Sequence, residues 1–179
     1  ADLPITSEHG PAAIWSMQSE FIPRVSNDEK VTSAHWSPDR ERILTTSEDR
    51  TARIWSSTGR LLSTLEHGDT VNEGAWSPDG ATIVTVEDDS TVNLWTREGN
   101  RLSILKDHSK PALQAKWSPD GSRFVTSSGG YEGPGYKGEA IVWSARGDRL
   151  ATVHTNGAGI LSVAWHPSGK YFVTIDANL

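Results

Sequence analysis

Short stretches in which apolar and polar residues alternate recur along the chain and predict β-strands. A first set lies at 31–36, 71–76, 112–117 and 160–165, and each member ends in a Trp that is followed by Ser-Pro-Asp or His-Pro-Ser, which is typical of a turn. A second set follows at 43–46, 83–86, 124–127 and 172–175. Two further sets lie at 51–55, 91–95 and 140–143, and at 61–65, 102–105 and 150–153. The pattern predicts units of four short antiparallel strands.

The eight tryptophans form two series that share one period. The first series closes the first strand set and consists of Trp36, Trp76, Trp117 and Trp165. The second closes the third strand set and consists of Trp15, Trp55, Trp95 and Trp143. A period of about 40 residues predicts a repeat protein. In both series the last interval is longer than the others, which indicates one shared insertion, at 127–139.

Four strands per unit, with no helical period between them, indicate an all-β fold in which each unit is one blade of a β-propeller. With the strands named a to d, the chain supplies c-d, three full a-b-c-d units and a-b, or four blade equivalents. We expect one domain or partial propeller over 1–179, with repeats at about 1–26, 27–66, 67–107, 108–154 and 155–179. The chain would form either half of a larger ring or a fragment of one, so we expect a homodimer or pairing with the remainder of a longer propeller.

Polar residues recur at fixed places in these units. In one unit His67 precedes strand a, Thr85 lies in strand b, and Asp89 stands six residues before Trp95 of strand c. These positions resemble the pattern of the WD-repeat (tryptophan-aspartate repeat) β-propeller family, and the resemblance covers essentially the whole chain in degenerate copies. It implies a structural tetrad in which buried hydrogen bonds run from indole to hydroxyl to imidazole to carboxylate.

The other two full units carry only partial tetrads. One consists of Thr45, Asp49 and Trp55, with Asn27 at the position of the His. The other consists of His108, Thr126 and Trp143, with no Asp at the expected place. The residue after the strand-c Trp is Ser or Thr, where the family often has Asp. The resemblance therefore rests on the alignment of four units rather than on one motif.

Composition and charge narrow the classes of function. The chain has 179 residues, of which 35% are apolar and 22% charged, and it has no Cys, which excludes disulfides and thiolate chemistry. Its formal charge of -6, with Lys and Arg scattered singly, argues against a nucleic acid or a membrane surface as partner. No apolar run approaches the ~20 residues of a membrane span, and no signal segment opens the chain. We therefore expect a cytoplasmic or nuclear protein.

Signatures of catalysis or metal binding are weak. No two of the six His have the i, i+2 or i, i+4 spacing of metal ligands, and no Ser-His-Asp arrangement or nucleophile elbow occurs. We predict no cofactor, no metal and no enzymatic activity. The strand-a tryptophans are expected to pack between blades.

Two surface segments are candidates for binding. The insertion is rich in Gly, and its candidate contact residues are Tyr131, Glu132, Tyr136 and Lys137, although a merely tolerated surface insertion would have the same composition. Acidic residues that recur at one period predict a rim consisting of Glu48, Glu87 and Asp88, with ordinary solvated turn residues as the alternative.

The function that follows is a non-catalytic scaffold or recognition module that binds a protein or peptide through one propeller face, built from the b-c and d-a loops. This prediction comes mainly from the family resemblance, since a fold alone does not imply a function. The alternative is a small-ligand or glycan-binding, lectin-like propeller with one site per blade.

Overall fold

A computed structural model describes residues 25–129, 137–155 and 159–176. These residues form three four-stranded antiparallel sheets and one two-stranded sheet, and no helix. Blade 1 contains β1 (Val31–Trp36), β2 (Arg42–Ser47), β3 (Thr51–Ser56) and β4 (Leu61–Glu66). Blade 2 contains β5 (Val71–Trp76), β6 (Thr82–Glu87), β7 (Val92–Thr96) and β8 (Arg101–Leu105). Blade 3 contains β9 (Ala112–Trp117), β10 (Arg123–Ser128), β11 (Glu139–Ser144) and β12 (Arg149–His154), and the half-blade contains β13 (Ile160–Trp165) and β14 (Phe172–Asp176).

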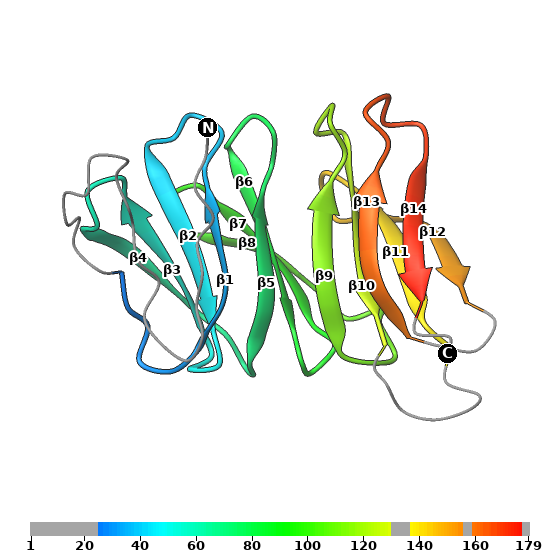
Figure 1. Cartoon of the computed structure of the whole chain (residues 1–179), viewed down its shortest axis with the longest axis horizontal. Helices are drawn as coiled ribbons and strands as arrows, with labels where there is room; N and C mark the ends of the chain where they lie inside the picture. Colours follow the sequence, from blue (N-terminus) through cyan, green and yellow to red (C-terminus); the bar gives the residue numbers. More distant parts are fainter. Residues whose placement is uncertain (1–24, 130–136, 156–158, 177–179) are drawn as a thin grey trace.

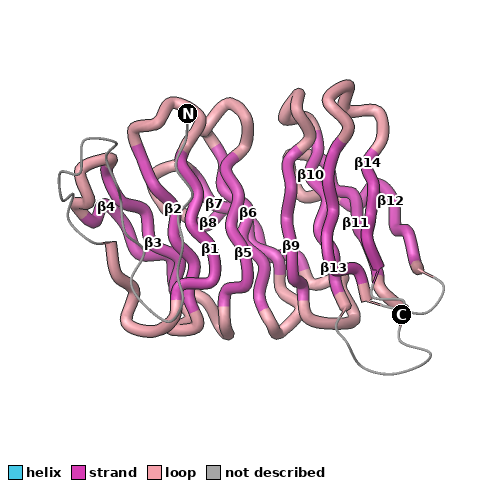
Figure 2. The backbone as a smooth tube through the Cα atoms, in the orientation of Figure 1, coloured by secondary structure: helices cyan, strands magenta, loops and turns pink. Residues whose placement is uncertain are grey.

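The predicted all-β fold of propeller blades is confirmed, with three full units followed by an a-b pair. The expected N-terminal c-d pair lies outside the described residues. The sheets stand side by side in an open fan, and the inner strands β1, β5, β9 and β13 are neighbours along it (Figure 1). Figure 2 shows that blade 1 and the half-blade lie toward opposite ends of this fan.

The turn between strands a and b is held by its own serine. In blade 1, Ser37 Oγ donates to Asp39 Oδ1 at 2.6 Å and accepts the backbone N–H of Arg42 at 2.9 Å. The serines of the other two full blades make the same pair of contacts. Each turn therefore forms locally, and it fixes the register of the strand that follows.

One turn position requires a left-handed backbone. Gly80 and Gly121 occupy it with φ of 70° and 69°, and Arg40 occupies it in blade 1 with φ of 65°. Glycine adopts this conformation freely, whereas a side chain is strained there. Blade 1 thus carries a local strain that blades 2 and 3 lack at this position.

Among the described residues, three hydrophobic clusters lie between blades, and a fourth, formed by Val25, Val31, Ile43 and Trp55, lies in blade 1 and the residue before it. The first joins Leu44, Ala52, Ile54 and Leu65 of blade 1 to Trp76, Ile83 and Trp95 of blade 2. The second joins Val84, Val86, Val92 and Leu94 of blade 2 to Ala112, Ala115, Phe124, Ile141 and Trp143 of blade 3. The third joins Val125, Ala140 and Val142 of blade 3 to Ile160 and Val163 of the half-blade. Each blade is therefore stabilised by apolar burial against the next.

The inner strands are also linked by hydrogen bonds that follow one rule. A side chain on one inner strand accepts a backbone N–H from the next, and the bonds are Gly74 N–H to Ser33 Oγ (3.3 Å), Ala115 N–H to Glu73 Oε2 (3.1 Å) and Val163 N–H to Gln114 Oε1 (3.1 Å). Positions 33, 73 and 114 are equivalent in the repeat, as are 74, 115 and 163. This repeated contact, called here the interblade bond, sets how each blade meets its neighbour.

The strand-a tryptophans supplement the interblade bond. Trp117 Nε1 donates to Ala75 O at 3.3 Å, and Trp165 Nε1 donates to Lys116 O at 3.0 Å, so each indole bonds to the preceding blade. Trp76 is 8% exposed in the first core, whereas Trp36 of blade 1 is 39% exposed.

Candidate functional site

The b-c and d-a connections gather at one edge of the fan, the lower edge in Figure 1, called here the loop face. It comprises the b-c connections 48–50 and 88–91, the described ends of the third b-c connection at 129 and 137–138, the d-a connections 67–70 and 106–111, and residues 26–30 before β1. Buried hydrogen-bond chains behind these loops hold them in place, one in each full blade.

In blade 2 the hydrogen-bond chain starts at the indole of the strand-c tryptophan. Trp95 Nε1 donates to Thr85 Oγ1 at 2.9 Å, and Thr85 lies 2.8 Å from Nε2 of His67. The other ring nitrogen, Nδ1, lies 2.8 Å from the carbonyl oxygen of Leu65. Burial lowers the pKa of His67 to about 4, so the ring is neutral at pH 7 and donates from Nδ1. Asp89 instead accepts the backbone N–H of Thr91 at 2.9 Å, so the imidazole ends on a carbonyl rather than on this carboxylate.

Glu87, placed by the sequence in the acidic rim, points into blade 2 and is only 2% exposed. Its Oε2 accepts the backbone N–H groups of Gly68 and Asp69 at 2.9 and 3.2 Å, and its Oε1 accepts from the amide of Asn93. Burial raises the pKa of this carboxyl group. The sequence signal for this role was strand parity, because Glu87 stands two residues after Thr85 and so lies on the same side of β6.

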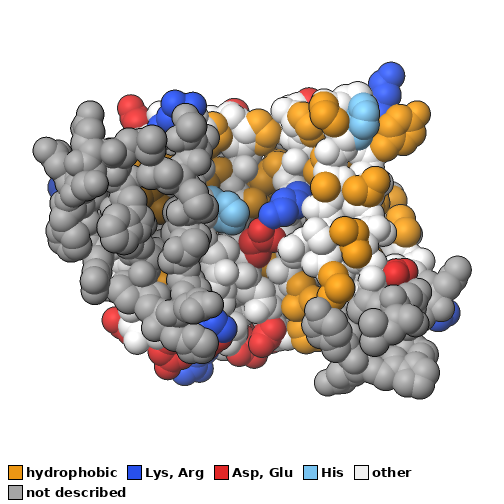
Figure 3. Space-filling model, viewed as in Figure 1, with side chains coloured by type: hydrophobic (Ala, Val, Ile, Leu, Met, Phe, Trp, Pro, Cys, Tyr) orange, Lys and Arg blue, Asp and Glu red, His pale blue; other side chains and the backbone are white. Residues whose placement is uncertain are grey.

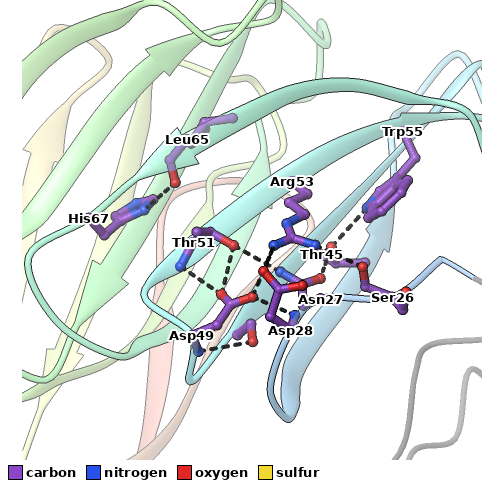
Figure 4. Close-up of polar contacts among 11 residues, drawn as sticks. Ser26, Asn27, Asp28, Thr45, Asp49, Thr51, Arg53, Trp55, Leu65 and His67 are labelled. Carbon is purple, nitrogen blue, oxygen red and sulfur yellow. Dashed lines mark hydrogen bonds and ion pairs between the residues drawn. The ribbon is translucent and has the colours of Figure 1, made fainter.

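Blade 1 has a hydrogen-bond chain of the same kind, although Asn27 stands at the position of the histidine (Figure 4). Trp55 Nε1 donates to Thr45 Oγ1 at 2.9 Å, and Thr45 donates to Asn27 Oδ1 at 2.8 Å. The amide of Asn27 then donates to Thr51 Oγ1 at 3.1 Å, and Thr51 donates to Asp49 Oδ1 at 2.7 Å. Asn27 and Thr51 together take the place of the imidazole. In blade 1 the hydrogen-bond chain therefore does end on a carboxylate, that of Asp49.

Asp49 also fixes the loop before β1. Its Oδ2 accepts the backbone N–H of Asp28 at 2.8 Å and lies 3.3 Å from Arg53, which reaches Asp28 at 2.6 Å and the carbonyl of Ser26 at 2.9 Å (Figure 4). The hydrogen bonds from Thr51 and Asp28 and the Arg53 charge lower the pKa of Asp49 against the opposing effect of burial. Asp49 in blade 1 and Glu87 in blade 2 therefore serve equivalent backbone positions.

Blade 3 obtains its carboxylate from a residue that the sequence analysis missed. Trp143 Nε1 donates to Thr126 Oγ1 at 2.8 Å, Thr126 lies 2.6 Å from Nε2 of His108, and His108 Nδ1 lies 2.9 Å from Glu139 Oε2. Burial lowers the pKa of His108, and Glu139 opposes part of this shift. The available signal was spacing, because Glu139 stands four residues before Trp143, where blade 1 has Thr51 before Trp55.

Of the insertion residues, Tyr131, Glu132 and Tyr136 lie outside the described residues. Lys137 is exposed, and the chain returns toward the sheet at Gly138. The Gly138 N–H donates to Thr155 Oγ1 and the Gly138 carbonyl accepts the backbone N–H of Thr155, both at 2.9 Å. The carboxylate of Glu139 follows at once, so the return point of the insertion is fixed against His108.

Carboxylates dominate the exposed part of the loop face in blades 1 and 2. The exposed acidic residues are Asp28, Glu29, Glu48, Asp88 and Asp89. Glu48 pairs with Lys30 at 2.8 Å, and Asp88 accepts from the amide of Asn72 at 2.7 Å. Acidic side chains are visible along this edge in Figure 3. Glu48 and Asp88 thus occupy equivalent surface positions on adjacent blades.

A second polar group lies on the inner face of the fan. Glu73 bonds to Lys116 and lies 3.7 Å from Nε2 of His35, whose pKa is lowered by burial. Nearby is an open pocket of about 290 Å³, lined by His35, Trp36, Pro38, Ala75, Trp76, Pro78, Lys116 and Trp117. The pocket is shared by three blades. Within the described residues, no group of three or more His, Cys, Asp or Glu could hold a metal ion.

The four-unit architecture agrees with a family model described as WD domain, G-beta repeat, which matches residues 18–56, 59–96, 99–133 and 147–175. The chain belongs to the WD40 repeat family. The first two WD40 matches end just after Trp55 and Trp95, and the fourth ends within β14. WD40 repeats generally mediate protein-protein interactions, and WD40 proteins are generally non-catalytic scaffolds. No curated protein is similar enough to this WD40 chain to count as a match. In its described part, no helix is long and apolar enough to cross a membrane.

Proposed function

We propose that the chain is a non-catalytic recognition module whose loop face binds a basic segment of a protein or peptide. The observation that carries this proposal is the row of exposed carboxylates on loops that are held from behind by buried hydrogen bonds. We further propose that 1–179 acts as one unit and that its partners include a second copy of the chain, through a different surface.

Rigidity of the loops supports the first proposal. Asp49 accepts a backbone N–H group of residues 26–30, and Glu87 accepts those of the d-a connection 67–70. The hydrogen-bond chains through Thr45 and Thr85 hold the strands beneath these loops. A partner that docks on such loops loses little free energy to ordering them. The surface is therefore preorganised.

Charge selects the partner class. Of the exposed carboxylates, Glu48 and Asp88 occupy equivalent positions on adjacent blades, and Asp28, Glu29 and Asp89 add negative charge around them. Complementary charge accelerates association and discriminates against partners of the same sign. A Lys/Arg-rich segment fits this surface, and an acidic segment is repelled.

The test measures binding of a short Lys/Arg-rich peptide by calorimetry, with an acidic peptide of equal length as the negative probe. Asp88→Asn and Glu29→Gln should each weaken binding by about two- to threefold, since exposed charge pairs contribute a few tenths of a kcal/mol. Glu98→Gln is the matched control, because Glu98 is exposed in the c-d turn at the opposite edge. Equal affinity in all three variants, or equal weakening by Glu98→Gln, contradicts the proposal.

We include the insertion in the same face, because its return at Gly138 and Glu139 is fixed there. Its proposed contact residues are Tyr131, Glu132, Tyr136 and Lys137. Removal of residues 131–136 should reduce the affinity of the chain for its protein or peptide partner, whereas the midpoint of unfolding should change little. Unchanged affinity removes the insertion from the binding surface.

The inner pocket favours a second candidate, the binding of a small planar or glycan ligand against Trp36, Trp76 and Trp117. Because one pocket spans three blades, this ligand would bind once per chain. Calorimetric stoichiometry near one, abolished by Trp36→Ala, supports this candidate, and one ligand per blade contradicts it.

A further inference from the structure

The inner pocket has walls that repeat from blade to blade. Trp36, Trp76 and Trp117 end the inner strands of the three full blades, and Pro38 and Pro78 follow two of them in the a-b turns. Figure 3 shows hydrophobic side chains gathered in the upper part of this face. Each lining residue belongs to one of the three full blades, so none lies at an end of the chain.

Contacts between neighbouring a-b turns hold the two prolines in place. Pro38 Cδ lies 3.5 Å from the point at which a Cβ on Gly80 would stand, and Pro78 Cδ lies 3.5 Å from the same point at Gly121. Each proline therefore packs on the turn of the next blade. The serine before each proline also bonds to the aspartate after it, which fixes the turn. A ligand that enters the pocket thus meets a wall that is already ordered, so it loses little free energy to ordering the protein.

The polar side chains of the pocket are mainly hydrogen-bond donors. Lys116 is partly exposed and bonds to Glu73 through its ammonium group, which has three N–H donors and so can also reach a ligand. Trp76 Nε1 is buried and has no partner within the described residues, whereas the equivalent indole of Trp117 donates to a carbonyl of the preceding blade. Burial lowers the pKa of His35, so its neutral ring supplies the one side-chain acceptor among the lining residues.

These groups fit a ligand that accepts hydrogen bonds and donates few. Sugar hydroxyl groups donate as well as accept, and a buried hydroxyl proton without an acceptor weakens binding. A proline residue instead has a carbonyl acceptor, an apolar ring and no N–H. In a polyproline II helix the carbonyl groups make no internal hydrogen bonds, and aromatic-lined grooves bind such segments.

We propose that the inner pocket binds a proline-rich segment of a partner protein in the polyproline II conformation. Pyrrolidine rings of the segment pack on the indoles of Trp36 and Trp117, and one of its carbonyl oxygens accepts from Lys116. Because the carboxylate of Glu73 offsets the charge of Lys116, the pocket favours an uncharged segment. The inference rests on the second candidate function, since it uses the same pocket, and it names a peptide instead of a glycan as the occupant.

The test measures the binding of a fluorescently labelled decaproline peptide to the full chain by fluorescence anisotropy. A Gly-Ser peptide of equal length is the negative probe, and we expect saturable binding of decaproline alone. Trp36→Ala should weaken this binding by about tenfold, because it removes an aromatic contact. The far-UV spectrum should not change, since Trp36 is already 39% exposed.

A matched pair of turn variants locates the peptide. Pro78→Ala should weaken the binding of decaproline by about three- to tenfold, because it removes two apolar ring carbons from the wall of the pocket. Pro119→Ala is the control and should leave the affinity unchanged. Pro119 is an exposed proline at the equivalent position of blade 3, and it does not line the pocket.

Four results overturn the proposal. The first is no binding of decaproline to the wild type, and the second is equal weakening by Pro78→Ala and Pro119→Ala. The third is weakening by Asp88→Asn but not by Trp36→Ala, which places the peptide on the loop face. The fourth is an oligosaccharide that binds in a Trp36-dependent way while decaproline does not, which supports the glycan ligand of the second candidate. Loss of Lys/Arg-rich peptide binding at the loop face alters none of these results, so that proposal and this one fail separately.

Discussion

The Nδ1 atom of His108 lies 2.9 Å from Oε2 of Glu139, although 31 positions separate the two residues in the chain. Thr126 accepts the indole N–H of Trp143, so its own hydroxyl proton faces His108 Nε2 and leaves Nδ1 to donate to Glu139. The carboxylate therefore fixes the tautomer of a buried imidazole. It also fixes the point at which the insertion returns to the sheet.

Replacement of Glu139 tests this relationship. Glu139→Ala should lower the free energy of unfolding by about 1–3 kcal/mol, because it leaves the buried His108 Nδ1–H without an acceptor. Glu139→Gln keeps an acceptor oxygen and should cost less. Urea unfolding measures both, with the exposed Glu98→Ala as control. A Glu139→Ala loss no larger than that of the control contradicts the assignment.

Thr45 connects an indole to an amide in blade 1, so its hydroxyl group can be removed alone. Thr45→Val preserves the shape and should lower the free energy of unfolding by about 1–3 kcal/mol, since both Trp55 Nε1 and Asn27 Oδ1 lose a partner. Thr64→Val on the exposed part of β4 is the control and should change stability little. Equal effects of the two changes would show that the hydrogen-bond chain in blade 1 contributes nothing to the free energy of unfolding.

Arg40 offers a stabilising substitution. Arg40→Gly should raise the free energy of unfolding by about 0.5–1 kcal/mol, because the strain of a side chain at φ of 65° exceeds the entropy that glycine adds to the unfolded chain. Thermal unfolding is the measurement. Arg60→Gly, in an exposed turn and without a left-handed φ, is the control and should not stabilise. No gain from Arg40→Gly would mean that the turn relaxes around its arginine.

His67 predicts a pH dependence of stability. Its pKa falls from 6.5 in the unfolded chain to about 4 in the fold because the ring is buried, so between these values the unfolded state binds more protons. The stability that the neutral ring contributes is complete above pH 6.5 and is lost as the pH falls toward 4. His67→Asn, which copies Asn27 of blade 1, should flatten the profile in this window. If the free energy of unfolding of the variant changes with pH as steeply as that of the wild type, the titrating group is not His67.

The blade pattern was predictable because each unit repeats it. The regular recurrence of tryptophan placed the strands, and the pairing of Trp55 with Thr45 and of Trp95 with Thr85 followed from the family resemblance. These contacts depend on positions within a strand pair, which the sequence preserves.

The carboxylates were harder to place because several stand side by side. Glu87, Asp88 and Asp89 are consecutive, and only their order relative to the end of β6 decides that Glu87 points inward. Glu139 was hidden for another reason, since the insertion breaks the spacing counted from Thr126. Spacing counted backward from Trp143 would have recovered it.

The interblade bond has a consequence for the joints between blades. Its acceptor grows from Ser33 to Glu73 and Gln114 as the residue that faces it grows from Gly74 to Ala115 and Val163. The three bonds have similar lengths, 3.3, 3.1 and 3.1 Å, because the size of the acceptor side chain changes together with the size of the residue that faces it. Each joint of the fan therefore has its own matched pair of residues. An exchange of one such pair would alter the contact at a single joint, since no strand within a blade depends on it.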